Sequence, residues 1–277
     1  AVRPALPTFP GFAFDAPTQG SGKTLMALSV AELATGAAFN GQLPSVWGFN
    51  RDNPAEDGKR WESVLRSGEG AAVMDNIVGC FDGGVLAPHL TSPSISIRPL
   101  YSQRTEVIPN RTLTLLTGNN LSLAGDFPRR VMTCRIDPGV ERPDARTGFE
   151  EDPLSAVAGG RMQMIADALS VVRAGLISGH PKPHTGVGSF ADWDRLVRHS
   201  VLWVGYKLDR EEMEVRLSPD EEPLKLGDPR DSIDEQQASD PDLEALREFL
   251  AGCWETWQAR TFTARDVVSA VRSAGRW

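Results

Sequence analysis

The octapeptide PTQGSGKT, at residues 17–24, combines residue types that bind a phosphate chain. Gly20 and Gly22 tolerate backbone conformations that turn peptide N–H groups inward, so the segment can form a cradle lined by amides. Lys23 adds an ammonium group for the phosphate oxygens, and the hydroxyl of Thr24 is a ligand for Mg²⁺. An apolar run, FAFD, precedes the loop and a helical pattern follows it, which places the anion at a helix N-terminus. The segment predicts a nucleotide-binding site.

The loop departs from the P-loop pattern G-x-x-x-x-G-K-[ST] at its first position, where proline replaces glycine. Pro17 cannot adopt a positive φ, so the chain must enter the loop in a different way. The other residues keep the chemistry, and we expect ATP and Mg²⁺ to bind there. The predicted cofactor-binding residues are Pro17, Thr18, Gln19, Gly20, Ser21, Gly22, Lys23 and Thr24. The alternative is a glycine turn that precedes an ordinary helix.

A carboxylate follows the apolar run AAVM, at Asp75. An acidic side chain at the end of a neighbouring strand would hold magnesium through water, so Thr24 and Asp75 form the predicted metal site; plain capping of a buried strand is the alternative. The next residue is Asn76, at a position where many ATPases with a P-loop carry a glutamate that activates water. An amide cannot accept the proton and can only orient the water. Hydrolysis is therefore expected to be slow, or to use another carboxylate such as Asp82.

The run TLTLLT ends in GNN, which puts Asn119 and Asn120 at the end of another predicted strand. On a strand between the loop strand and the Asp75 strand, Asn119 in particular would reach the γ-phosphate and the attacking water, although Gly-Asn is also common turn chemistry. Ten residues later come Arg129 and Arg130, which are either ordinary surface residues or donors to a neighbouring subunit's nucleotide, with Arg130 the first choice. The predicted catalytic residues are Lys23, Asp75, Asn76, Asn119, Arg129 and Arg130.

A layered α/β core must position these residues. Apolar runs of strand type alternate with helical stretches, which predicts a parallel core sheet. These runs occupy residues 12–15, 45–49, 71–75, 112–117 and 131–136. Between the third and fourth, SISI and TEVI flank a bend, which predicts a β-hairpin over residues 94–108.

The chain divides into four predicted parts. Residues 1–140 form the α/β ATPase core, 141–206 a helical lid, 207–240 an acidic, solvated excursion, and 241–277 two terminal helices. The net charge of −8 argues against coating of nucleic acid by the whole surface but allows a local basic channel. The sequence holds no apolar run of the roughly 20 residues that cross a bilayer. Its three cysteines have neither zinc-ligand spacing nor a disulfide framework, so we expect a cytoplasmic protein with reduced thiols.

The order of these segments resembles the AAA+ ATPase/helicase module of phage and prophage replication proteins, which often follows a primase-polymerase region. The likeness runs from about Phe12 to Val204, and its most specific part is PNRTLTLLTGNNLSLAGDFPRRVMTCRIDP, with a later FADWDRLVRHSVLWVG. The resemblance implies a ring, with a hexamer as its expected form, that couples ATP hydrolysis to movement on DNA. It also implies that the hairpin points into the central pore; a surface hairpin with solvated charges is the alternative. The implied DNA-binding residues are Arg98, Tyr101, Gln103 and Arg104.

The terminal helices, with ETWQARTFTARDVV, resemble the opening of a winged-helix domain. The sequence stops at Trp277 before a recognition helix and wing are complete, which indicates either a fragment of a longer protein or a false likeness. The leading hypothesis is an oligomeric, ATP-dependent DNA helicase or translocase. The alternatives are an ATP-dependent loader or remodeller that acts on a partner protein, and a non-hydrolysing, nucleotide-gated DNA-binding module.

Overall fold

The structure is a computed structural model of the 277-residue chain. It describes residues 2–36, 44–50, 52–84, 86–98, 104–140, 142–149, 151–178, 185–210, 225–238 and 241–274. Two of the predicted DNA-binding residues, Tyr101 and Gln103, lie outside the described residues.

A five-stranded, fully parallel sheet forms the centre of the molecule, in the order β2-β3-β6-β1-β7. Its strands are β1 (Gly11–Ala16), β2 (Ser45–Gly48), β3 (Ala71–Phe81), β6 (Leu113–Leu123) and β7 (Val131–Arg135). The predicted α/β class with a parallel core sheet is confirmed. The strand that carries Asn119 lies between the other two site-bearing strands, as expected, so side chains from three strands can meet at the carboxyl edge of the sheet.

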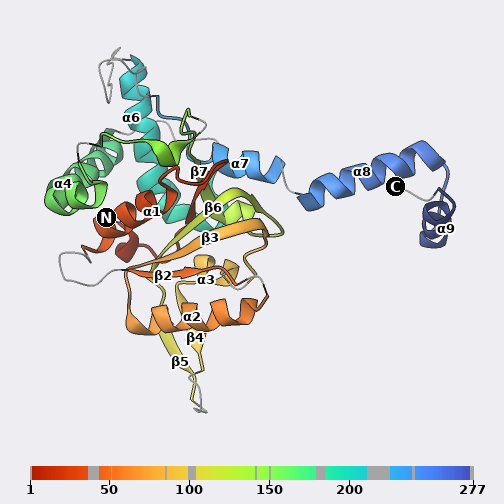
Figure 1. The fold of residues 1–277 in the computed structure, drawn as a ribbon, viewed down its shortest axis with the longest axis horizontal. Helices are drawn as coiled ribbons and strands as arrows, with labels where there is room; N and C mark the ends of the chain where they lie inside the picture. The colour runs from red at the N-terminus through yellow and green to blue at the C-terminus, as the bar shows by residue number, and fades with distance from the viewer. Residues whose placement is uncertain are drawn as a thin grey trace.

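Helices flank the sheet, except for the last two along the chain, which project away from it (Figure 1). They are α1 (Lys23–Thr35), α2 (Pro54–Ser67), α3 (Ala87–Thr91), α4 (Pro153–Ser178), α5 (Ala191–Trp193), α6 (His199–Arg210), α7 (Asp231–Ala238), α8 (Pro241–Trp257) and α9 (Ala264–Ala274), with a π-helical turn at Asp194–Arg198. α1 packs on β1, β3 and β6, while α4 packs on α1 and α6 packs on α4. None of the described helices has the length and hydrophobicity that a membrane-spanning segment needs.

An arginine of α4 fixes this helix against the end of α1. Arg161 Nε donates hydrogen bonds to the carbonyl oxygens of Glu32 (3.2 Å) and Leu33 (3.1 Å), and Nη2 donates to that of Ala34 (3.3 Å). The last carbonyl groups of a helix lack intrahelical partners and carry partial negative charge, so a guanidinium group is favourable there. This contact holds α4 on the helix that begins at the phosphate loop.

The hairpin predicted between residues 94 and 108 is confirmed. β4 (Ser94–Ile97) pairs antiparallel with β5 (Glu106–Pro109), and Ile97 lies opposite Glu106. Ile97 is buried in the core, and β5 lies against α2. Arg98 follows β4 and Arg104 precedes β5, so the base of the hairpin is anchored while these arginines lie beyond the paired strands.

Two strands are longer than their sequences predict. We expected β3 to end at Asp75 and β6 at Asn120, but they continue to Phe81 and Leu123. Each strand carries one extra residue relative to its partner: β3 between the pairs Met74–Leu116 and Ile77–Gly118, and β6 between Val78–Asn119 and Cys80–Ser122. The residues at these bulges, Asn76 and Asn120, have φ values of 56° and 49°. Asparagine tolerates this left-handed region better than most residues do, so the turn chemistry bends the strands without ending them.

Part of the segment that we expected to be a solvated excursion, residues 207–240, packs on the core instead. α7 contacts β7 and the 3₁₀ turn Pro128–Arg130, and its Ile233 is buried (Figure 1). The acidic composition of this segment suggested solvation, but one of its carboxylates, Asp228, pairs with the buried Arg198. The two terminal helices predicted within residues 241–277 are confirmed as α8 and α9, which Figure 1 shows projecting away from the sheet. The resemblance to a winged helix stays a prediction.

Candidate nucleotide-binding site

The glycine-rich loop connects β1 to the first residue of α1 at the carboxyl edge of the sheet. Gly20 and Gly22 have φ values of 73° and 84°, in the left-handed region that favours glycine. A Cβ atom at Gly20 would lie only 2.8 Å from the Cβ of Asp144, so the linker after the sheet leaves no room for a side chain there. Both glycines thus have left-handed backbone conformations, and a helix N-terminus with unsatisfied N–H groups follows the loop directly.

Lys23 lies folded back on the loop and is 8% exposed. Its Nζ donates hydrogen bonds to Asn119 Oδ1 (2.7 Å), Ser21 Oγ (3.0 Å) and the Thr18 carbonyl oxygen (3.1 Å). All three acceptors are neutral. Burial lowers the pKa of Lys23 below its ordinary value, although the carboxylates of Asp15 and Asp75 act in the opposite direction.

Thr24 and Asp75 meet across 51 residues of sequence. The Thr24 hydroxyl donates to Asp75 Oδ1 (2.8 Å), and the Thr117 hydroxyl donates to the same oxygen (2.6 Å). Thr117 Oγ1 also accepts a hydrogen bond from the Asn76 amide (3.0 Å), which holds the β3 bulge in place. The sequence reasoning did not identify Thr117, although a threonine two residues before Asn119 on the same strand face is the signal that would have found it.

The two asparagines at the bulges have different surroundings. Asn76 is exposed, and it is the backbone N–H of this residue that donates to Thr117 Oγ1. Asn120 Nδ2 donates to the carbonyl oxygen of Pro17 (3.3 Å), which joins β6 to the start of the loop. The structure therefore places Asn119 against Lys23 and Asn120 against the loop backbone.

Asp82, the other carboxylate that we considered as a base, does not reach this site. It follows the end of β3, seven positions after Asp75, which is roughly 20 Å along a strand that rises about 3.3 Å per residue. Its Oδ1 accepts a hydrogen bond from the Gly84 amide (3.0 Å), as in a local turn. No structural reason remains to assign it a part in water activation.

The residues at the loop fit a magnesium nucleotide. Thr18 Oγ1 is buried and has no hydrogen-bond partner within the described residues, so a polar group inside the loop lacks an interaction that a ligand can supply. Thr24 and Asp75 offer the hard oxygen atoms that Mg²⁺ prefers. Among the described residues, no three or more His, Cys, Asp or Glu side chains gather as a metal cage. One hydroxyl and one carboxylate suit Mg²⁺, which usually binds few protein groups together with phosphates.

Arg129 and Arg130 lie at the opposite edge of the sheet. They belong to a 3₁₀ turn directly before β7. The first residue of β7, Val131, pairs with the first residue of β1, Gly11, whereas the phosphate loop follows the last residue of β1. The two edges are roughly 16 Å apart along β1, at about 3.3 Å per residue. Arg130 is 16% exposed and donates to Asp126, the Ala87 carbonyl oxygen and Thr91 Oγ1 (3.4 Å), whereas Arg129 is 55% exposed and pairs with Asp126. Neither arginine lies at the loop of its own chain.

A third arginine joins this pair. Arg129, Arg130 and Arg230 line a pocket of about 200 Å³ between the 3₁₀ turn, α7 and residues 186–190. Arg230 was not predicted as a site residue, because it belongs to the acidic segment, residues 207–240, that we expected to be solvated. Its Nη1 donates to the Gly186 carbonyl oxygen (3.1 Å), and its guanidinium group pairs with Asp234 (3.3 Å).

The segment FADWDRLVRH, which contributed to the family resemblance, forms a buried ion-pair network. Arg198 is 1% exposed and donates to both carboxylate oxygens of Asp228 (2.6 Å each), to Asp194 Oδ1 (2.8 Å) and to the Thr185 carbonyl oxygen (2.7 Å). Trp193 of the same segment is buried against Phe9 and Phe12. These contacts join the helical region to the sheet and to the start of α7.

Comparison with known proteins adds a distant structural likeness. The sequence matches no protein-family model and no curated protein. Among solved structures, the chain is similar to JCV (JC virus) helicase bound to a thiazolopyridine-phenoxyphenyl acetamide, with 16% sequence identity, a TM-score of 0.33, and coverage of 76% of this chain and 53% of that chain. The chain thus spans about half the length of that structure. A likeness of this size transfers no function, which must be inferred from the site.

Proposed function

We propose that this chain is an AAA+ ATPase module that binds and hydrolyses ATP with Mg²⁺. The observation that carries the proposal is the convergence of Lys23, Thr24, Asp75 and Asn119 at the carboxyl edge of the sheet, with β6 between the loop strand and the Asp75 strand. Residues 17–24 would enclose the phosphates through backbone amides and the Lys23 ammonium group. Thr24 and Asp75 would hold the Mg²⁺, which neutralises phosphate charge when bound.

The contacts of Lys23 indicate how the site would accept a nucleotide. Its three acceptors are uncharged oxygens, and anionic phosphate oxygens form stronger, charge-assisted hydrogen bonds with an ammonium group. Exchange of these acceptors for phosphate would release Asn119 Oδ1. Asn119 would then be available to the γ-phosphate and to the attacking water.

Activation of the attacking water would be the slow step of the proposed ATP hydrolysis. Asn76 provides a side-chain amide where a carboxylate is expected, and Asp82 lies beyond the end of β3. Asn76 would therefore orient water without taking its proton. The same observation favours a second candidate function, a nucleotide-controlled switch that loads or remodels a partner protein. A switch of that kind tolerates slow hydrolysis better than a motor does.

The arginines at the amino edge support an oligomer. Because Arg129 and Arg130 lie roughly 16 Å from the loop of their own chain, a role at a γ-phosphate requires a neighbouring subunit, as in a hexameric ring. Arg130 uses its guanidinium group in contacts to Asp126 and Ala87, while Arg129 is more exposed. The proposal therefore assigns the contact in trans to Arg129 before Arg130, the reverse of the sequence-based choice.

The hairpin supports a DNA partner. Arg98 lies with Lys59 and Arg66 around a groove of about 660 Å³ between α2 and the hairpin, and Arg104 lies on the other arm. Arginine and lysine side chains bind DNA phosphates without reading sequence, as a translocating protein requires. We propose that single-stranded or forked DNA contacts this hairpin in the ring, and that the module acts as a helicase or translocase in phage or prophage replication.

The test is ATP hydrolysis by the purified chain, with and without single-stranded DNA. We expect magnesium-dependent hydrolysis that DNA stimulates, and a loss on the order of 10²–10³ in rate for Lys23→Ala. Lys225→Ala, which removes an exposed lysine, is the matched control and should hydrolyse ATP at the wild-type rate.

Strand displacement on a forked duplex separates the two candidate functions. Displacement by the chain alone supports the helicase. ATP hydrolysis without strand displacement by the chain alone, followed by displacement once a replication partner is added, supports the loader. A folded wild-type protein that shows no ATP hydrolysis with or without DNA overturns the ATPase proposal.

A further inference from the structure

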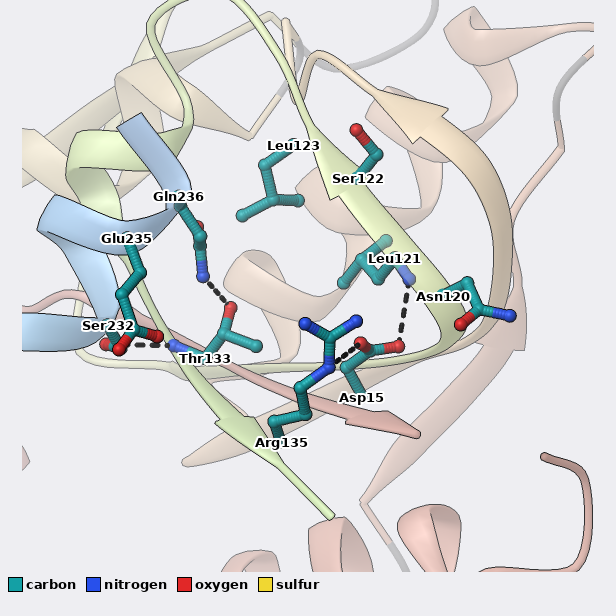
Figure 2. Close-up of a pocket in the computed structure, with 10 residues that line it drawn as sticks. All are labelled: Asp15, Asn120, Leu121, Ser122, Leu123, Thr133, Arg135, Ser232, Glu235 and Gln236. Carbon is teal, nitrogen blue, oxygen red and sulfur yellow. Dashed lines mark hydrogen bonds and ion pairs between the residues drawn. The ribbon is translucent and has the colours of Figure 1, made fainter. Parts of the chain in front are cut away.

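Asp15 is a carboxylate buried in the last part of β1, two residues before the loop, and is 2% exposed. Burial of a charged carboxylate is costly unless hydrogen bonds or opposite charges compensate for it. Figure 2 shows its two contacts: Oδ1 accepts a hydrogen bond from the Leu121 amide (2.8 Å), and Oδ2 lies 3.6 Å from Nε of Arg135. Arg135 is 72% exposed, so the short contact to the β6 backbone is the stronger of the two.

The amide that Asp15 binds belongs to the bulge of β6. In the parallel register Asp15 lies beside Gly118, yet its carboxylate reaches the amide three residues further along, directly after Asn120 with its φ of 49°. On the other side, β3 approaches so closely that a Cβ atom at Gly118 would lie 2.8 Å from the Ile77 carbonyl oxygen. The bulged segment is therefore fixed between β3 and the Asp15 carboxylate.

This segment carries two side-chain hydrogen bonds between β6 and the loop. Asn119 Oδ1 lies 2.7 Å from Lys23 Nζ, and Asn120 Nδ2 donates to the carbonyl oxygen of Pro17 (3.3 Å). One strand, β1, thus supplies the entry to the loop and, through Asp15, the support for the asparagines that face it. A shift of the bulge would move Asn119 relative to Lys23 without removing any group that binds phosphate.

We propose that Asp15 is a positioning residue, which acts on ATP hydrolysis by holding the Leu121 amide and so the side chain of Asn119. The inference rests on the proposed function, because it assigns Asp15 a part in that reaction. It differs from a purely structural role in what it predicts: a change in turnover that passes through Asn119. Misplacement of a reacting group by about 1 Å can reduce a rate on the order of 10²-fold.

The experiment measures kcat and the Kd of a fluorescent ATP analogue for Asp15→Ala, Asp15→Asn, Asn119→Ala and the double variant Asp15→Ala/Asn119→Ala. We expect Asp15→Ala to lower kcat on the order of 10-fold or more, with a Kd within about twofold of wild type. Asp15→Asn keeps an oxygen acceptor for the Leu121 amide and should restore most of the rate. The double variant should be no slower than Asn119→Ala, because both changes remove the same effect.

Glu235→Gln is the control, since Glu235 lines the same pocket of about 390 Å³ beside β7 and α7 (Figure 2) and should leave kcat unchanged. If Asp15→Ala does not fold, Asp15→Glu replaces it: the longer side chain keeps the charge but displaces the carboxylate from the amide, so kcat should still fall.

Hydrogen exchange gives an independent readout, because the Leu121 amide should lose protection in Asp15→Ala and keep it in Asp15→Asn.

The outcomes separate this inference from the proposed function. A wild-type protein without ATPase activity overturns the proposed function, and this inference with it. A wild type that hydrolyses ATP while folded Asp15→Ala, or Asp15→Glu in its place, matches its kcat overturns the inference alone. Effects of Asp15→Ala and Asn119→Ala that multiply in the double variant also overturn it, since they would show that Asp15 acts independently of Asn119.

Discussion

Two clusters of buried polar groups in this molecule differ in how completely they are satisfied. The Arg198 guanidinium group has two carboxylates and a carbonyl oxygen as acceptors, so its charge is compensated inside the protein. The loop has a buried hydroxyl, Thr18 Oγ1, without a partner within the described residues, and an ammonium group, Lys23 Nζ, held by neutral oxygens. The first cluster suits permanent contacts that stabilise the fold, and the second suits exchange of contacts with an anionic ligand.

The pKa directions follow the same difference. The hydrogen bonds that Arg198 donates to Asp228 and Asp194 raise its pKa above the ordinary value, against the effect of burial. At Lys23 the result is reversed, because burial lowers the pKa and the nearby carboxylates only oppose it. A buried cation that lacks a bonded carboxylate has more to gain from a phosphate group than one that is already paired.

Removal of Arg198 should produce the largest change in stability. Arg198→Met leaves Asp194 and Asp228 without their partner inside a packed region, and we expect the free energy of unfolding to fall by about 3 kcal/mol. Chemical denaturation measures this change. Arg195→Met, at an exposed pair with Asp192, is the control and should change stability by less than about 0.5 kcal/mol. Equal effects of the two variants would show that the buried network does not stabilise the fold.

Asp75→Asn should have the opposite profile, with a large loss of activity and little loss of stability. The amide keeps an oxygen for the hydroxyls of Thr24 and Thr117 but removes the negative charge that would hold Mg²⁺. We expect hydrolysis to fall on the order of 10²-fold, in a steady-state assay with Mg²⁺ titrated. Asp82→Asn, beyond the end of the same strand, should match wild type. A variant Asp75→Asn with normal turnover would remove this residue from the proposed site.

Acid should act on the Arg198 cluster through Asp228. Although burial raises its pKa, hydrogen bonds from Arg198 and from the Arg230 amide outweigh burial and lower the pKa below its ordinary value. A carboxylate with a depressed folded-state pKa adds stability above its unfolded pKa of about 3.9, and this stability is lost as the pH falls through the folded value. Unfolding measured from pH 7 down to pH 3 should show a steeper acid decline for wild type than for Asp228→Asn. Parallel curves would contradict the pairing.

The smallest expected effects concern the hairpin. Arg98→Ala and Arg104→Ala should each weaken binding of single-stranded DNA without a change in stability, since both lie beyond the paired strands. If each arginine contacts one phosphate, the slope of log affinity against log salt should fall by about 0.7 per substitution. Arg142→Ala, at an exposed linker position, is the control for a change of charge alone. Salt slopes that stay at the wild-type value would exclude the hairpin from the DNA contact.

The loop and its supporting strands could be predicted from sequence because local patterns indicate them. A glycine-rich turn between an apolar run and a helical pattern indicates the loop, and Asp75 follows a short apolar run that is typical of a buried strand. The bulges at Asn76 and Asn120 were not predictable, because asparagine after a strand indicates a turn whether the strand ends or bends. The structure resolves this through long-range contacts, such as those of Thr117 to Asp75 and to the Asn76 amide.

The acidic composition of the segment before and within α7 predicted solvated chain, and this prediction was wrong because long-range contacts again decide the structure. Charged residues and prolines are typical of solvated chain, and a single sequence does not show that Asp228 pairs with an arginine 30 positions earlier. Arg230 and the pocket that it shares with Arg129 depend on the same packing. Asp15 was visible as an acid at the end of the run FAFD, but its partner is an amide 106 residues away.

The central claim is that the loop at residues 17–24 encloses a magnesium triphosphate. Titration of the folded chain with a fluorescent ATP analogue, with and without Mg²⁺, tests it most directly. The account predicts saturable binding that Mg²⁺ strengthens and that Lys23→Ala abolishes, while Lys225→Ala binds as wild type does. Folded wild-type protein that shows no saturable binding with Mg²⁺ present would contradict the claim.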